Sequence, residues 1–194
     1  MPYATSQLIQ QINEGHQPSY IFFWGHDSGS DGQIGPACLS QWYASGFEQA
    51  GKIFPTAEHW MMYQKALLFA DQTSAEEVLL TSSPQTAKAI GRRVKNFNDV
   101  TWRSHAYKVV CEGNKHKFSQ PLLRDYLLST GDNILVEASP YDRIWGIGLS
   151  VQDPKAHNPK QWQGTNLLGF ALMEVRDELR KDYKSALLSS SHGN

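Results

Sequence analysis

The 194-residue sequence contains little cysteine, no long hydrophobic run and no excess charge of either sign. Its two cysteines, Cys38 and Cys111, lack metal-ligand spacing and are interpreted as free thiols. No apolar run approaches the roughly 20 residues that span a membrane, and no signal-peptide pattern begins the chain. We therefore expect a soluble cytoplasmic protein, or a nuclear one in a eukaryote, with no membrane partner.

The charge balance also limits the possible functions. With 18 basic and 19 acidic residues the net charge is -1, so binding to nucleic acid mainly by charge is not expected. Common catalytic motifs are missing as well, since the chain has no GxSxG, no P-loop and no complete GxGxxG. The 7 histidines include no HExxH pattern. We predict neither a metal site nor a cofactor.

The densest apolar stretch, Pro55 to Ala70, predicts a central helix with Thr56 as its N-cap. A helix that is apolar nearly all round is expected to be buried on most sides. Glu58 and Lys65 nevertheless lie on one stripe of it, and burying them costs free energy unless they are paired or act on a ligand. Spacing alone leaves two interpretations equally open, one a structural ion pair or a stripe that reaches water, the other a functional site. His59 points away from Glu58 and is interpreted as a packed core histidine.

The remaining pattern predicts an α-rich α+β fold with a few short strands. Helices are predicted at Thr5 to Asn13, Thr73 to Leu80 (with a capping box at Thr73 to Glu76), Ser83 to Gly91, Asp99 to Lys115, Gln120 to Leu128 and Thr165 to Tyr183. Strands are predicted at Tyr20 to Trp24, Leu39 to Phe47, Lys52 to Phe54 and Ile134 to Ala138. Loops are predicted at Gly25 to Pro36 and Ser150 to Gly164. We divide the chain into a helical extension (1–15), one compact domain (16–184) and a disordered tail (185–194).

A second informative cluster is VEASPYDRIWGIG, where Glu137 ends a strand and Asp142 and Trp145 lie in the following turn. Further on, the run GTN ends at Asn166 and opens the last helix, whose amides suit a phosphate. Each signal alone is weak. Together, acids, a lysine, aromatic planes and anion-holding amides suit cleavage of a glycosidic bond in a nucleotide-like ligand.

Four blocks in this order, GKIFPTAEHWMMYQKA, VTWRSHAYKVV, LVEASPYDRIWGIG and GTNLLGFALMEVRDEL, resemble the NADAR (YbiA-like) family over most of residues 20–180. The resemblance implies a small α-rich fold and N-glycosidase activity, on riboflavin-pathway intermediates in some members and on ADP-ribosylated guanine in others. It also implies catalytic or binding roles for Glu58, Trp102 and Asp142, and a lysine that forms a Schiff base with ribose. Helix geometry favours Lys65 as that lysine, and Lys52 is the other candidate.

We therefore predict an N-glycosidase that releases ADP-ribose from ADP-ribosylated guanine in DNA, RNA or nucleotides. The alternatives are a glycosidase of phosphorylated riboflavin intermediates and a non-catalytic ADP-ribose-binding module. Lys65, Glu58 and Asp142 are the predicted catalytic residues, expected to share one hollow shielded from solvent. The predicted substrate-binding residues are Trp24, Gly25, Ser40, Gln41, Trp42, Lys52, His59, Trp102, Trp145, Gly146, Ile147, Gly148 and Asn166. Family members often carry Ser-Asn-Phe at positions 40–42, so the contact with the base is expected to differ. The oligomeric state is left open.

Overall fold

The computed structural model describes residues 2–26 and 33–190. Parts of the predicted loop (27–32) and of the predicted tail (191–194) lie outside these residues. The described chain is rich in helices with two small two-stranded sheets, as the predicted α-rich α+β class requires. It divides into two units, which we call the terminal unit (Met1–Trp24 and Pro121–Asn194) and the central unit (Gly25–Gln120).

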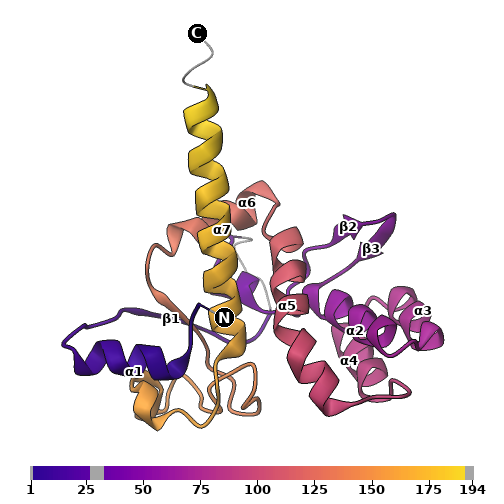
Figure 1. Ribbon diagram of the computed structural model, residues 1–194, viewed down its shortest axis with the longest axis horizontal. Helices are drawn as coiled ribbons and strands as arrows, with labels where there is room; N and C mark the ends of the chain where they lie inside the picture. Colours follow the sequence, from indigo (N-terminus) through magenta and orange to yellow (C-terminus); the bar gives the residue numbers. More distant parts are fainter. Residues whose placement is uncertain (1, 27–32, 191–194) are drawn as a thin grey trace. The chain divides into compact units, whose positions relative to one another are not determined.

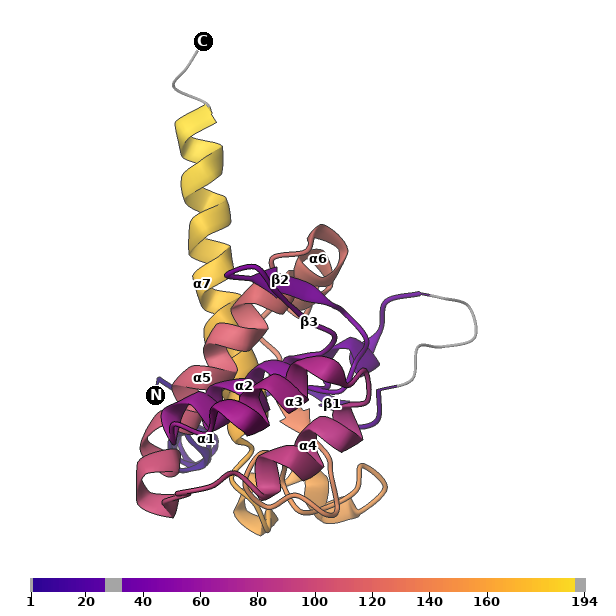
Figure 2. The ribbon, with the colours of Figure 1, turned by 90° about the vertical axis from the view of Figure 1, so that its right-hand side faces the viewer.

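The central unit is built around α2 (Ala57–Leu68), which packs against α3 (Gln72–Leu80), α4 (Pro84–Arg92) and α5 (Asp99–Lys117) (Figure 2). The Thr56 hydroxyl caps α2 by accepting a hydrogen bond from the His59 amide, as predicted. Two glycines let the neighbouring helices approach closely. A Cβ atom at Gly91 would lie 1.9 Å from Met62 Sδ, and one at Gly113 would lie 2.4 Å from Trp60 Cδ1. The prediction of a central, largely buried helix is confirmed.

The segment before α2 differs from the prediction. Leu39 to Phe47 does not form one strand. Leu39 ends a short 3-10 helix, η1 (Pro36–Leu39), that Pro36 opens and that buries Cys38 and Leu39, and residues 40–46 lie in turns and irregular backbone. The predicted turn at residues 50 and 51 and the strand β3 (Lys52–Phe54) are confirmed, but the strand that pairs with β3 is β2 (Phe47–Gln49).

The start of α3 was also predicted wrongly. Asp71, rather than Thr73, caps this helix, because Asp71 Oδ1 accepts a hydrogen bond from the Ser74 amide at 3.2 Å. The other oxygen of Asp71 accepts a hydrogen bond from the Lys95 amide at 2.9 Å. The Asp71 carboxylate therefore accepts hydrogen bonds from two backbone segments, whereas the single hydroxyl of a threonine cap would accept one from the helix alone.

In the terminal unit, β1 (Tyr20–Phe23) pairs in parallel with β4 (Ile134–Glu137). The long helix α7 (Leu167–Ser190), labelled in Figure 1, packs on β4. This unit also contains α1 (Thr5–Asn13) and α6 (Pro121–Ser129). The segment predicted as a loop after residue 150 holds two short 3-10 helices, η2 (Pro154–His157) and η3 (Pro159–Gln161). Within the described residues, α7 is longer than predicted, and no helix is both long and apolar enough to cross a membrane.

Candidate functional site

The amine of Lys65 lies in a half-buried setting of the central unit. Its Nζ donates a hydrogen bond to the Gly91 carbonyl at 2.7 Å and lies 4.2 Å from the ring centroid of Phe97. The ring of Trp102 is 5.5 Å away. Burial lowers the pKa of Lys65, and the negative charge of Glu58 opposes that shift. The amine is therefore partly desolvated, and it is close enough to Glu58 for the carboxylate to influence its proton affinity.

Glu58 lies in the first turn of α2 and is only 5% exposed. Its backbone amide donates a hydrogen bond to the Gln41 carbonyl at 3.0 Å, which joins the helix to the Ser40–Trp42 segment. The central unit thus brings Glu58, Lys65 and Trp102 into one electrostatic environment. A buried acid and a half-buried amine in this environment are suited to proton transfer and nucleophilic attack.

Two buried side chains of α5 hold the Ser40–Trp42 segment, and sequence reasoning missed both. Lys117 Nζ donates a hydrogen bond to the Ser40 carbonyl at 2.7 Å, and Asn114 Nδ2 donates one to Gln41 Oε1 at 2.8 Å. Both residues are 0% exposed. Burial lowers the pKa of Lys117 to about 7 and raises the pKa of the nearby Cys38 thiol to about 11. The sequence pattern that could have identified Asn114 and Lys117 is their spacing from Val110, because positions 110, 114 and 117 lie on one stripe of a helix.

The ring of Trp42 has two basic side chains as neighbours. His26 lies 5.5 Å away between ring centroids, and Lys88 Nζ lies 5.7 Å from the Trp42 centroid. Neither residue was predicted to belong to the site. A flat ring beside two basic groups suits a ligand that combines an aromatic base with phosphate.

The remaining predicted site residues of the central unit differ in their exposure to solvent. Lys52 is exposed on β3, where it pairs with Gln49 across the hairpin. His59 is 0% exposed, its Nδ1 is 2.8 Å from Thr56 Oγ1, and burial lowers its pKa. His59 is therefore a core residue, as its helix position indicated, and its predicted contact with substrate stays a prediction. Gly25 is exposed at a φ of 84 degrees.

In the terminal unit, Asp142 braces the turn that carries Trp145. Asp142 Oδ1 accepts hydrogen bonds from the amides of Ile144 (2.8 Å) and Trp145 (2.7 Å). The Ser139 hydroxyl in turn accepts a hydrogen bond from the Asp142 amide at 3.2 Å. One carboxylate oxygen is thus committed to turn geometry. Asp142 therefore supports the turn on which the half-buried Trp145 lies, and its catalytic role stays a prediction.

The glycines of WGIG serve close backbone packing. A Cβ atom at Gly146 would lie 2.8 Å from the Glu137 carbonyl oxygen, and one at Gly164 would lie 2.3 Å from the Gly146 carbonyl oxygen. Gly148 has a φ of 68 degrees, which a residue with a side chain rarely adopts. Ile147 is 0% exposed. These positions shape the turn, and the Ile147 side chain offers no surface to a ligand.

Asn166 also proves to be structural. It is 0% exposed, its Nδ2 donates to the Leu135 carbonyl at 2.9 Å, and its Oδ1 accepts from the Glu137 amide at 3.0 Å. Both side-chain groups therefore satisfy the backbone of β4 just before α7 begins. Burial and these two hydrogen bonds give the Asn166 side chain a structural role, and its predicted contact with substrate stays a prediction.

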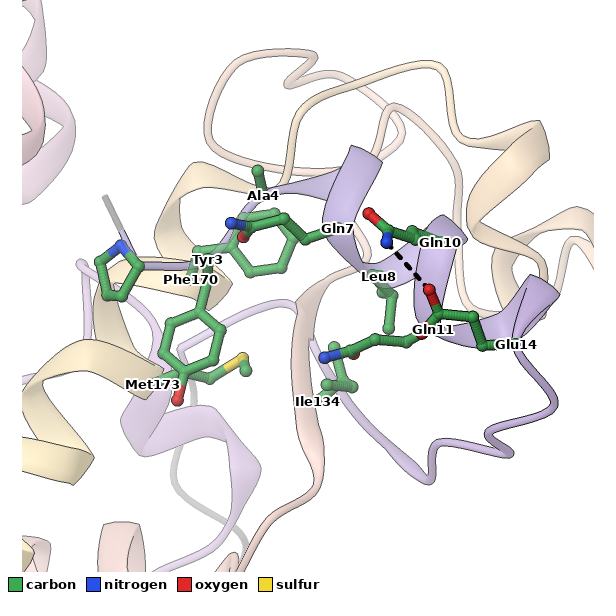
Figure 3. A pocket seen from close by; sticks show the side chains of 11 residues that line it. Tyr3, Ala4, Gln7, Leu8, Gln10, Gln11, Glu14, Ile134, Phe170 and Met173 are labelled. Atoms are coloured by element: carbon green, nitrogen blue, oxygen red, sulfur yellow. Dashed lines mark hydrogen bonds between the residues drawn. The ribbon is translucent and has the colours of Figure 1, made fainter.

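A cavity of about 350 Å³ lies in the terminal unit between α1, β4 and α7 (Figure 3). Its lining includes Leu8, Gln11, Ile134 and Met173, and none of the predicted site residues. Tyr3 lines its edge and donates a hydrogen bond to Asp177, and burial raises the pKa of Tyr3 to about 12. The lining of this cavity therefore includes none of the predicted catalytic residues. Among the residues described, no three His, Cys, Asp or Glu side chains gather closely enough to hold a metal ion.

Comparison with known proteins identifies the class to which this architecture belongs. Residues 22–180 match the NADAR domain, so the chain belongs to the NADAR domain family. An N-glycosidase of Acanthamoeba polyphaga mimivirus is 42% identical over 165 residues, covering 82% of this chain and 95% of that protein. The N-glycosidase YbiA of Escherichia coli is 35% identical over 130 residues, 66% of this chain and 72% of that protein.

Two further comparisons bear on fold and function. The NMR structure of Escherichia coli YbiA matches with a TM-score of 0.68 at 30% identity, covering 87% of this chain and 89% of that chain. The α-rich fold is therefore that of a YbiA-like protein. The Zea mays riboflavin biosynthesis protein PYRR is 36% identical over 135 residues, 65% of this chain but 20% of that protein.

Proposed function

We propose that this protein is an N-glycosidase that cleaves the bond between ribose and base in ADP-ribosylated guanine, in nucleic acid or nucleotides, and releases ADP-ribose. The mimivirus and bacterial relatives named as N-glycosidases support the reaction type. The observation that carries the proposal is the half-buried Lys65 amine, whose pKa responds to Glu58. Trp42 with its two basic neighbours supports a substrate that has both a base and phosphates.

The proposed reaction uses the amine as nucleophile. Protonation of the ribose ring oxygen opens the ring and leaves an iminium between the anomeric carbon and the guanine nitrogen. Neutral Lys65 adds to that carbon, and guanine departs with a proton, which leaves the lysine joined to the sugar as an imine. Water then hydrolyses the imine, releasing ADP-ribose and the free amine. Glu58 is assigned the proton transfers, because its side chain is buried and its charge influences the pKa of the amine.

Within this proposal the two predicted acids have different roles. Glu58 acts on protons at the reacting centre, whereas Asp142 holds the turn of Trp145 through its two amide contacts. Removing the Asp142 carboxylate is therefore expected to act through the shape of the turn. An Asp142→Asn variant keeps an acceptor for the two amides and should retain most activity, whereas Asp142→Ala should lose it.

The direct test is reductive trapping. Wild-type protein is incubated with ADP-ribose and borohydride, and the modified residue is mapped by mass spectrometry. We expect a reduced adduct on Lys65 and none on the exposed Lys52. An adduct on Lys52 would contradict the assignment, and turnover without any adduct would exclude the imine.

Lys65→Arg is the matched variant, because arginine keeps a cation for the Gly91 carbonyl and the two rings but is not nucleophilic. The variant should fold with wild-type circular dichroism and lose both turnover and trapping. Lys52→Arg should lose neither. A folded Lys65→Arg variant with normal turnover would refute covalent catalysis by this residue.

A second candidate function is cleavage of a phosphorylated riboflavin-pathway intermediate, favoured by the match to the Zea mays riboflavin biosynthesis protein. Product analysis separates the two, since one substrate releases ADP-ribose and the other releases ribose phosphate. Binding of ADP-ribose without turnover on either substrate would instead support a non-catalytic binding module.

A further inference from the structure

Two aromatic side chains of the terminal unit are largely exposed although they touch each other. Trp24 is 57% exposed and Tyr141 is 87% exposed. Their ring centroids lie 6.1 Å apart with an angle of 51 degrees between the ring planes. Ile144, in the same turn as Tyr141, is 57% exposed. Large apolar groups left in water contribute little to the core, so fold stability does not account for this group.

The backbone beneath both rings is well held. Trp24 directly follows β1, and the Phe23 carbonyl accepts a hydrogen bond from the Ala138 amide at 2.9 Å, which extends the pairing of β1 with β4. Beyond that point, the Ser139 hydroxyl accepts a hydrogen bond from the Tyr141 amide at 3.3 Å. The rings are thus carried on the ends of paired strands and on a hydrogen-bonded turn. Such support lowers the entropy cost of binding a ligand.

We propose that Trp24 and Tyr141 form a stacking platform for a nucleobase of the substrate other than the guanine that is released. Because the two rings already contact each other, the base stacks on an outer face of the pair rather than between the rings. This inference rests on the proposed function and adds a substrate determinant to it. The adenine of ADP-ribose and an unpaired base beside the modified guanine share the required flat aromatic chemistry.

The size and charge of the platform favour a base over a protein partner. A stable protein interface buries roughly 1,000 Å² or more, which two rings and Ile144 fall well short of, whereas a single ring covers a base. The chain's net charge of -1 provides no general basic field for a phosphate backbone. Stacking is therefore expected to carry most of the contact between the platform and the base.

The kinetic test compares three substrates in wild-type protein and a Trp24→Ala/Tyr141→Ala double variant. The substrates are an ADP-ribosylated guanine in a short single-stranded oligonucleotide, ADP-ribosylated guanosine monophosphate, and guanosine monophosphate carrying only ribose phosphate. Loss of stacking should lower kcat/KM about 5- to 150-fold through KM, with kcat unchanged, on substrates that carry the second base. Trp24→Phe and Tyr141→Phe should restore most of the loss.

The three substrates also identify the source of the base. A loss on both ADP-ribosylated substrates assigns the platform to adenine, and a loss on the oligonucleotide alone assigns it to a neighbouring base. Unchanged kinetics on all three, or an equal loss on the substrate without a second base, would overturn the platform.

A binding measurement separates failure of the platform from failure of the proposed function. Trp24 fluorescence, isolated by comparison with Trp24→Phe, should be quenched by ADP-ribose or by an unmodified single-stranded oligonucleotide. Quenching that Tyr141→Ala weakens supports the platform even if the protein proves to have no glycosidase activity. Absence of quenching by both ligands in an active enzyme refutes the platform and leaves the proposed function intact.

Discussion

At the scale of single residues, the chemistry of Lys65 depends on two opposing influences. Burial favours the neutral amine, while Glu58 favours the ammonium. The Gly91 carbonyl and the Phe97 ring both stabilise the charged form. In the proposed mechanism Lys65 must lose a proton before it attacks, so these influences would set the fraction of protein that can react.

This balance gives a prediction for Glu58→Gln. Glutamine cannot transfer the proton, so kcat should fall about 10²- to 10⁴-fold. Removing the negative charge also removes the influence that raises the pKa of Lys65, so the amine becomes neutral at lower pH. The acid limb of borohydride trapping against pH should therefore move to lower pH than in wild type. A limb that stays in place or moves upward would contradict the coupling of these two residues.

A second residue-scale prediction concerns Lys117, whose pKa is lowered by burial from 10.5 to about 7. Between these values the unfolded chain holds a proton that the folded chain lacks, so this residue makes the free energy of unfolding rise with pH. The contribution is at most about 1.4 kcal/mol per pH unit. Lys117→Met should flatten the slope between pH 7.5 and 9.5 in urea unfolding.

The matched control is Lys115→Met, on the same helix but exposed. It should keep the wild-type slope, which removes the contributions of other titrating groups from the comparison. A methionine in place of Lys117 cannot donate the hydrogen bond to the Ser40 carbonyl, so absolute stabilities are not compared. Equal slopes in the two variants would show that Lys117 is charged in the folded protein at pH 7.5.

At the scale of elements, Asn166 links the start of α7 to β4. Its φ of 54 degrees is tolerated by asparagine and glycine better than by alanine. Asn166→Ala should lower the free energy of unfolding by about 2–6 kcal/mol, because it leaves two buried backbone groups of β4 unsatisfied. Asn166→Gly keeps the φ but not the hydrogen bonds, so the difference between the two variants measures backbone strain. Urea unfolding of both variants checks this, and a loss below about 1 kcal/mol in each would contradict the role.

The elements also show how far local pattern leads. The central place of α2, its Thr56 cap and the hairpin before it were predictable, because apolar density, capping and turn residues act within a few positions. The hydrogen bond from the Lys95 amide to Asp71 was not predictable, because it joins residues far apart in sequence. The same holds for Lys117, whose partner carbonyl at Ser40 lies in a segment wrongly predicted as a strand. The sequence shows that Lys117 lies on the same stripe of α5 as Val110, but it does not show that the Ser40 carbonyl accepts a hydrogen bond from Lys117.

At the scale of the whole molecule, the terminal unit is assembled from both ends of the chain, with the central unit between them in sequence. Its sheet pairs Tyr20 with Ile134, so the intervening chain must be closed before the strands can meet. The NADAR match begins at residue 22, yet Leu8 of α1 is only 4% exposed. The segment predicted as an extension therefore contributes to the core of the terminal unit.

This leads to a prediction for a variant that lacks residues 1–15. Deletion of these residues should expose Phe170 and Met173, which are each 2% exposed in the full chain, and it removes the hydrogen bond from Tyr3 to Asp177. Hydrogen exchange followed by mass spectrometry should show faster exchange in β4 and the first half of α7, with α2 unchanged. Leu8→Ala in the full chain should give a smaller effect in the same peptides, about 2–5 kcal/mol in unfolding free energy, and exposed Ser6→Ala should give none. Equally faster exchange in α2 and α7 would contradict this prediction, because it would mean that residues 1–15 stabilise both units together. Unchanged exchange in β4 would also contradict it, because it would mean that α1 does not stabilise the terminal unit.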